Sequence, residues 1–354
     1  MLVVMPSFKV AIQCLCYNHA PFVKRTLDGL SSQKTEFKYI AVVIDDASTD
    51  GTQDVIKQYL NQYFYVSNDI SKSQWETEDA FFFHLRHKEN TNFELVFISL
   101  KYNFNQQKKS KSPIMAEWIG NAKYWAFCEC DDYWIYDRKI QEQVDFLDSN
   151  DDYGLVYSDF DIENYDTGEY INAALKNGVK PIIHSFEEHL LKAAYIAPMS
   201  WMCRIPLNEL MNNYQGPPTI DTSFIMALEL FLRSKVFFWN KVTCVYGRHS
   251  GSATKQETLA SRYHYAHGVY ATQKYYLDKY NLREKYPNCL DYFLNAYYCY
   301  IISNKIKEEY DEVRLFFHRN RDTSFKFRLF ENMMKSQWMF PILQAMCKQR
   351  IKNN

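Results

Sequence analysis

Clustered carboxylates are the residues of this chain that most clearly suggest chemistry. The stretch CECDDYW contains Glu129, Asp131 and Asp132, directly after the apolar run YWAF. A second acidic pair, Asp45 and Asp46, follows the apolar run YIAVVI. Packing like charges together costs free energy unless a positive partner neutralises them. Both clusters are therefore candidate ligand sites, although an acidic pair after a strand is also typical of solvated turns and helix N-caps.

Two strand–helix units position these acids. The apolar, β-rich segments VAIQCLCYN and YIAVVI read as buried strands, and each is followed by a helical pattern. Pro21 suits the first turn of one helix, and Ser48, Thr49 and Asp50 are N-cap candidates for the next. Continuous apolar strands alternating with helices predict an α/β fold with a mostly parallel sheet.

Ligands of open α/β sheets bind beyond the carboxyl ends of the strands, so both acidic clusters are expected at one rim. Carboxylate oxygens there suit Mg²⁺ or Mn²⁺, which in turn neutralise phosphate oxygens. A carboxylate without a metal can accept hydrogen bonds from a ribose hydroxyl or a base N–H. The chain has neither GxGxxG nor GxxxxGK[ST], so a metal, and not a glycine-rich loop, is expected to hold phosphate.

Composition narrows the class of protein. The 354 residues carry a formal net charge of -1, which gives no electrostatic case for nucleic-acid binding. We expect one large domain or two, no membrane span and no signal peptide.

Nine cysteines without disulfide-scaffold spacing favour a reducing, cytoplasmic compartment. The C-x-C pairs at Cys14/Cys16 and Cys128/Cys130 allow a four-thiolate zinc site, but buried small hydrophobes are the expected reading.

Most of the first 160 residues resemble the family 2 glycosyltransferases, inverting enzymes of the GT-A fold that use nucleotide-diphosphate sugars. The resemblance runs through CYNHAPFVKRTLDGLSSQ, VVIDDASTDGT and YWAFCECDDYWIYDRKIQEQVDFLDSN. It implies a Rossmann-like mixed sheet flanked by helices. It places the nucleotide at Tyr17, Asn18, Asp45, Asp46 and Asp131. It places the Mn²⁺ or Mg²⁺ ligands at Asp132, Asp131 and Glu129, the last standing where many members have Asp.

Weaker matches in the second half imply further roles. The stretch TIDTSF puts Asp221 on the proposed catalytic base, and a helix N-cap is its compatible alternative. YGRHSGS puts Arg248 and His249 near the departing diphosphate, with a solvated loop as the alternative. APMSWMCR resembles the acceptor side, where Trp201 would stack on a sugar, although a packed core tryptophan is equally compatible.

The sequence predicts a catalytic domain over residues 1–255 and a helical region over 256–354. Residues 325–354 mix basic and large apolar side chains, so they either lie on an anionic membrane surface or pack on the protein's own core. We expect a cytoplasmic protein, or a peripheral one at the inner face of the membrane.

The expected function is metal-dependent, inverting transfer of a sugar from a nucleotide-diphosphate sugar to a glycan or lipid-linked acceptor, in cell-surface polysaccharide or glycan biosynthesis. Two alternatives stay open. A sugar-nucleotide nucleotidyltransferase would share the fold, but it usually needs a glycine-rich N-terminal loop that QCLCYNHAPFVKRT lacks. A non-catalytic nucleotide-binding protein could also keep the GT-A fold.

Overall fold

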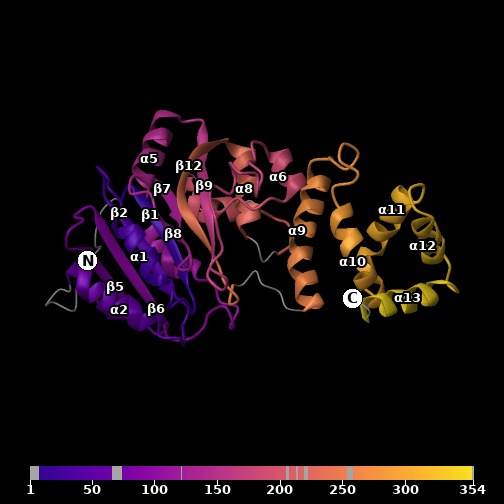
Figure 1. Ribbon diagram of the computed structural model, residues 1–354, viewed down its shortest axis with the longest axis horizontal. Coiled ribbons are helices and arrows are strands. Elements are labelled where there is room, and N and C mark those ends of the chain that lie inside the picture. Colours follow the sequence, from indigo (N-terminus) through magenta and orange to yellow (C-terminus); the bar gives the residue numbers. More distant parts are fainter. Residues whose placement is uncertain are drawn as a thin grey trace. The chain divides into compact units, whose positions relative to one another are not determined.

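The computed structural model describes residues 8–65, 74–120, 122–204, 207–212, 214–218, 222–252 and 258–352. The chain divides into two compact units (Figure 1). Unit 1 comprises Met1–Tyr214 and Ser223–Ser252, and unit 2 comprises Gln215–Thr222 and Ala253–Asn354. The boundary predicted between residues 255 and 256 falls outside the described residues.

Four parallel strands form the centre of the unit 1 sheet, in the order β6-β2-β1-β7. Their bounds are β1 Val10–Cys16, β2 Tyr39–Asp45, β6 Phe93–Leu100 and β7 Tyr124–Phe127. Every residue of β2, β6 and β7 is buried, because helices and loops cover both faces of these strands. The predicted α/β class with a mostly parallel central sheet is confirmed.

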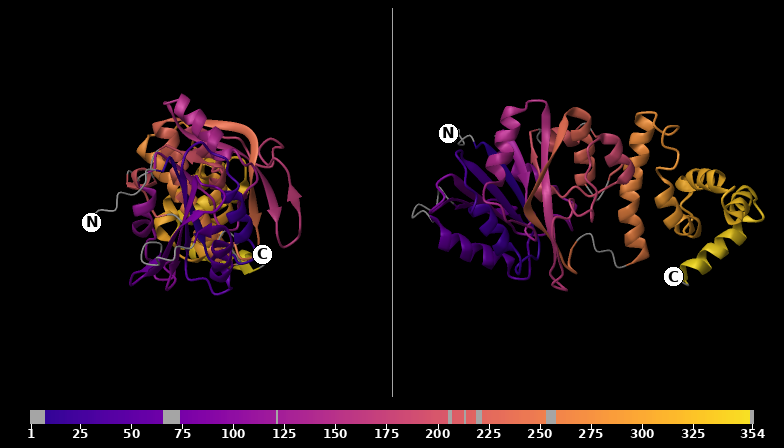
Figure 2. Two further views of the ribbon diagram at one scale, coloured as in Figure 1. Left: turned by 90° about the vertical axis from the view of Figure 1, so that its left-hand side faces the viewer. Right: turned by 45° about the horizontal axis from the view of Figure 1, so that its top comes forward.

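Antiparallel strands extend this sheet on both sides. The twelve strands of the described residues follow the path β3-β5-β6-β2-β1-β7-β11-β9-β12-β8, with β10 on β9 and β4 on β5. The long strands β9 and β12 run parallel to each other (Figure 2). The added strands are β3 Phe64–Tyr65, β4 Gln74–Glu76, β5 Ala80–His87, β8 Tyr133–Trp134, β9 Tyr153–Asn164, β10 Tyr170–Ile171, β11 Met202–Cys203 and β12 Lys235–Arg248.

Helices follow the strands as the apolar periodicity indicated. They are α1 Val23–Ser31, α2 Thr52–Tyr63, α4 Ser112–Ile119, α5 Lys139–Ser149, α6 Phe186–Lys192, α7 Leu207–Asn212 and α8 Thr222–Arg233. The N-cap of α2 is Gly51, in the left-handed region at φ 92, and not one of the three predicted polar residues. Asp50 still contributes, because its Oδ1 accepts the backbone N–H of Thr52 at 3.0 Å. Ser48 is turned instead towards Asp45.

The described part of unit 2 is helical, as predicted for the C-terminal region. Its helices are α9 Leu259–Lys279, α10 Asp291–Ser303, α11 Tyr310–Asn320, α12 Phe325–Lys335 and α13 Phe340–Lys352. Aromatic side chains form its core, with Tyr298, Phe317 and Phe330 in mutual ring contact. None of the helices in the described ranges combines the length and the apolar character that crossing a bilayer requires.

Candidate active site

The loops after β1 and β2 are joined by hydrogen bonds at the carboxyl edge of the sheet. Asn18 adopts a left-handed φ of 56, and its backbone N–H donates to Ser48 Oγ at 2.8 Å. The Asn18 Oδ1 atom accepts the backbone N–H of Thr49 at 2.9 Å. The backbone N–H of His19 donates to Thr52 Oγ1 at 2.8 Å. These bonds fix the turn that carries Tyr17, Asn18 and His19, and Tyr17 is left exposed on it.

Asp45 organises the loop that follows β2. Its carboxylate is fully buried and accepts hydrogen bonds from the Ser48 backbone N–H at 3.0 Å and from Gln53 Nε2 at 2.7 Å. The Ser48 hydroxyl donates to the same carboxylate. These donors occupy both carboxylate oxygens of Asp45, so this side chain holds the loop after β2 in place. Its predicted nucleotide contact stays a prediction.

Asp46 anchors the polar segment NFNQQKKSKSP, residues 103–113, which follows β6. Its carboxylate accepts the backbone N–H groups of Phe104 at 2.6 Å and Asn105 at 3.2 Å. Lys111 Nζ lies 2.8 Å from Asp46 Oδ2, and the Lys111 side chain is only 20% exposed. The positive charge of the Lys111 side chain therefore lies beside the acids at this edge of the sheet. In the sequence, its only signal is the run of lysines in NFNQQKKSKSP.

One acid and two histidines from three distant segments meet at this rim. The Asp131 Oδ2 atom lies 3.3 Å from His249 Nε2 and 4.0 Å from His19 Nε2. Candidate ligand atoms of these three residues all lie within 4.8 Å of one another, and they are the one such cluster in the described ranges. His19 follows β1, Asp131 follows β7, and His249 follows β12.

The His19 imidazole is suited to bind a metal ion through a nitrogen lone pair. Burial lowers the pKa of its imidazole below the ordinary value, although Asp131 opposes that shift. Its buried Nδ1 makes no hydrogen bond with any described residue. Its ring packs edge-on against His249, with 5.8 Å between centroids. A neutral imidazole is the form that binds metal ions. Sequence reasoning missed His19, whose signal was its place directly after the YN pair.

The other two acids of the CECDDYW stretch, Glu129 and Asp132, do not belong to the group formed by Asp131 and the two histidines. Asp132 is buried, and its Oδ1 accepts the backbone N–H of Gly247 at 2.8 Å. Burial, reinforced by Asp131, raises the pKa of Asp132 well above its ordinary value. Burial and Asp131 also raise the pKa of Glu129 to about 8, against the opposing charge of Lys111. The geometry favours Asp131 as the metal ligand, and the predicted roles of Asp132 and Glu129 stay predictions.

The candidate site residues predicted in the second half of the chain do not all lie together. His249 joins the cluster, whereas the neighbouring Arg248 points elsewhere, with its guanidinium 5.7 Å from the centroid of the Tyr246 ring. Trp201 is fully buried and packs edge-on against Phe127, so the core alternative holds and the predicted stacking on an acceptor sugar is corrected. Asp221 lies outside the described residues, and α8 begins with the next residue.

The two C-x-C pairs do not form a metal centre. Their four thiols are free and buried, and within the described ranges no cysteine belongs to a candidate metal cluster. Burial is the first cause that raises the pKa values of Cys14, Cys16 and Cys128. The alternative of small buried hydrophobes is therefore the correct one for the described structure.

Comparison with known proteins agrees with this architecture. Residues 14–72 match the model of the family described as glycosyl transferase family 2. Uncharacterized proteins Rv1520 of Mycobacterium tuberculosis and Mb1547 of Mycobacterium bovis are each 30% identical over 139 residues, 39% of this chain. That match spans only 31% of the length of either relative.

Solved structures show the fold over nearly the whole chain. Residues 1–349 of TarS from S. aureus, in complex with UDP, superpose with a TM-score of 0.51 at 13% identity, covering 96% of this chain and 91% of that one. The same protein in complex with UDP-GlcNAc gives a TM-score of 0.50 at 13% identity and covers 98% and 90%. The predicted GT-A fold is confirmed.

Proposed function

We propose that the chain transfers a sugar from a nucleotide-diphosphate sugar to an acceptor hydroxyl, with inversion of the anomeric centre, and the match of residues 14–72 to glycosyl transferase family 2 supports this. The observation that carries the proposal is the cluster of Asp131, His19 and His249 at the carboxyl edge of the parallel strands. Ligands of open α/β sheets bind at this edge. The structurally similar TarS is known in complex with UDP and with UDP-GlcNAc.

A divalent cation such as Mn²⁺ or Mg²⁺ fits the cluster. One carboxylate and two imidazoles within 4.8 Å supply oxygen and nitrogen donors, a set that suits Mn²⁺ better than Mg²⁺. The Nδ1 atom of His19 has no hydrogen-bond partner among the described residues, and His249 Nε2 lies 3.3 Å from the Asp131 carboxylate, so the three side chains could share one ion. When bound, the cation would supply Lewis-acid stabilisation to the leaving diphosphate.

The chain's own residues have distinct roles in this scheme. The turn of Tyr17 and Asn18 and the segment held by Asp46 border the nucleotide, and Lys111 adds positive charge there for an anionic ligand. Asp221 acts as the base that takes the proton from the acceptor hydroxyl. Arg248, stacked near Tyr246, is free to meet the acceptor or the diphosphate from the β12 side.

Unit 2 has a surface that suits a lipid-linked acceptor. The side chains of Trp338, Phe325 and Ile342 are 89%, 80% and 55% exposed. Lys335 and Lys348, which lie on the same two helices as Phe325 and Ile342, add positive charge. Exposed aromatic and basic side chains together bind anionic lipid surfaces. We propose that the protein acts at the inner face of the membrane, in the synthesis of a surface glycan, and these exposed side chains support the proposal.

A thermal-shift screen tests the donor site. UDP, GDP, dTDP and CDP are each added with and without Mn²⁺, to the wild-type chain and to Asp131→Asn. Stabilisation of the wild type by one diphosphate only with Mn²⁺, lost in the variant, is the expected result, because a ligand of the native state raises its stability. No shift with any nucleotide would refute the donor site and return the chain to the non-catalytic alternative.

A further inference from the structure

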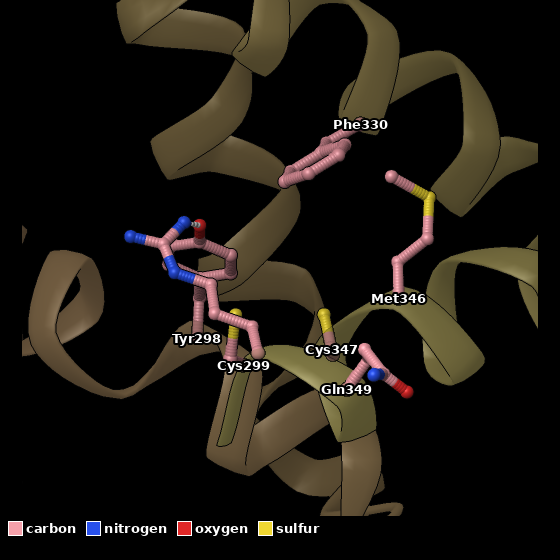
Figure 3. A pocket seen from close by; sticks show the side chains of 7 residues that line it. Tyr298, Cys299, Phe330, Met346, Cys347 and Gln349 are labelled. Atoms are coloured by element: carbon pink, nitrogen blue, oxygen red, sulfur yellow. Dashed lines mark hydrogen bonds between the residues drawn. The ribbon is translucent and has the colours of Figure 1, made fainter. Parts of the chain in front are cut away.

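Unit 2 contains a cavity that the proposed sugar transfer does not use. It has a volume of about 480 Å³ and lies among α10, α12 and α13 (Figure 3). It is lined by Tyr298, Cys299, Phe330, Met346, Cys347, Gln349 and Arg350. A neighbouring cavity of about 290 Å³ shares Tyr298, Cys299 and Arg350 and adds Arg262 of α9. Neither lining includes an acidic side chain.

Two thiols face each other in this cavity. Cys299 comes from α10 and Cys347 from α13, and both side chains point into the space (Figure 3). Helices α10 and α13 pack against each other, and both thiols line the same cavity. Cys299 is half-buried, whereas Cys347 is buried. The more exposed Cys299 is therefore the thiol that a reagent reaches more readily, and Cys347 lines the same cavity.

The groups around Cys299 stabilise its thiolate. Arg350 donates from Nη1 to the Tyr298 hydroxyl at 2.6 Å, and Lys326 Nζ lies 5.0 Å from the Tyr298 ring centroid. The hydrogen bond from Cys347, helped by Tyr298, Arg350 and Lys326 and opposed by burial, lowers the pKa of Cys299 to about 7. The same pairing raises the pKa of Cys347, which stays protonated.

The remaining cysteines lack this environment. Six lie buried in unit 1, namely Cys14, Cys16, Cys128, Cys130, Cys203 and Cys244. Cys289, in unit 2, is half-buried like Cys299. Burial nevertheless raises the pKa of Cys289 to about 11. Cys289 is thus a matched internal control for the reactivity of Cys299.

We propose that Cys299 and Cys347 form a redox-active dithiol site that exchanges with low-molecular-weight disulfides. The Cys299 thiolate attacks one sulfur of the disulfide RSSR, forming a mixed disulfide and releasing RS⁻. Cys347 gives its proton to RS⁻, and its thiolate then attacks the Cys299 sulfur and releases the second RS⁻. The two protein thiols lose two electrons, RSSR gains them, and the new Cys299–Cys347 bond ties α13 to α10.

Alkylation of the unmodified 354-residue chain is the first test, and it needs no variant. The protein is treated with limiting iodoacetamide at a series of pH values, and each cysteine peptide is quantified by mass spectrometry. Near pH 7.5 we expect Cys299 to react more than about tenfold faster than Cys289, since its larger thiolate fraction outweighs its lower intrinsic nucleophilicity. Equal rates, or a Cys299 rate that rises only above about pH 9, would overturn the proposal.

Exchange with oxidised glutathione tests the second thiol. We expect the wild type to end with a Cys299–Cys347 disulfide, and Cys347→Ser to stop at glutathione on Cys299. Cys299→Ser should leave Cys347 unmodified, and Cys289→Ser should behave as wild type. A wild type that keeps glutathione on Cys299 without passing it to Cys347 would contradict the paired site.

Discussion

Gly247 is the position where one methyl group would do most damage to the candidate active site. Strand β12 passes so close to the acidic loop that a Cβ on Gly247 would lie 2.1 Å from the Asp131 backbone oxygen. It would also lie 2.6 Å from Cε2 of Tyr165 and 2.8 Å from its hydroxyl. The Gly247 backbone N–H donates to Asp132 at 2.8 Å, so moving the strand away breaks a buried hydrogen bond. Gly247→Ala therefore disturbs the backbone of two site acids at once.

The cost follows from these contacts. Overpacking a rigid interior typically costs about 1–3 kcal/mol. Leaving a buried donor or acceptor without its partner costs about 1–3 kcal/mol, and the two effects share one displacement, so they do not add fully. We expect Gly247→Ala to lower the free energy of unfolding of unit 1 by about 2–4 kcal/mol. Because the displaced backbone carries Asp131, affinity for Mn²⁺ should fall as well.

Urea unfolding and Mn²⁺ titration calorimetry measure the two effects. Ser250→Ala is the matched control, since Ser250 is exposed in the loop directly after β12 and already carries a Cβ. It should keep wild-type stability and Mn²⁺ affinity. If Gly247→Ala also unfolds at the wild-type urea concentration and binds Mn²⁺ normally, then β12 does not approach Asp131 as closely as described, and the geometry of the cluster fails with it.

Three further substitutions probe separate parts of unit 1. Asp131→Asn should weaken Mn²⁺ binding more than tenfold in calorimetry, and more than Asp132→Asn does; the reverse order would contradict the assignment of Asp131. Lys111→Met removes a partner of Asp46. It should lower the free energy of unfolding measured in urea by about 1–2 kcal/mol and weaken nucleoside-diphosphate binding. Burial lowers the pKa of His189 in the folded protein to about 3, whereas the same side chain in the unfolded chain has a pKa of about 6.5. As the pH falls below about 6.5, only the unfolded chain binds this proton, so the free energy of unfolding decreases. Between about pH 7.5 and pH 5 the wild type should lose about 2 kcal/mol more than His189→Leu, and equal losses would refute the neutral buried histidine.

Local patterns were enough to predict the sheet and the place of its acids. Continuous apolar runs ending in carboxylates gave β2 and β7, and parallel pairing then fixed which edge those carboxylates share. The partners of the acids could not be predicted this way. His249 and Asp131 are 118 residues apart, and they meet because β12 pairs with β9 and β8 at the far side of the sheet.

Two positions show what local composition does not carry. Lys111 lies in the polar segment NFNQQKKSKSP, but the Asp46 carboxylate accepts two backbone N–H groups there and pairs with Lys111. For Trp201 the sequence left sugar stacking and core packing equally open, and its burial against Phe127 selects the core. In each case a long-range contact decided the outcome. A window of neighbouring residues carries no information on such contacts.

The fold neutralises most of its clustered acids internally. The Asp45 carboxylate is satisfied by Ser48 and Gln53, and that of Asp46 by Lys111 and two backbone N–H groups. Asp132 accepts the backbone N–H of Gly247, and burial raises its pKa. Two imidazoles, of His19 and His249, lie near the Asp131 carboxylate, and burial lowers the pKa of His19. Asp131 is hydrogen-bonded to His249 and, within the described residues, pairs with no lysine or arginine, so it is the acid that the fold leaves best placed to bind a cation.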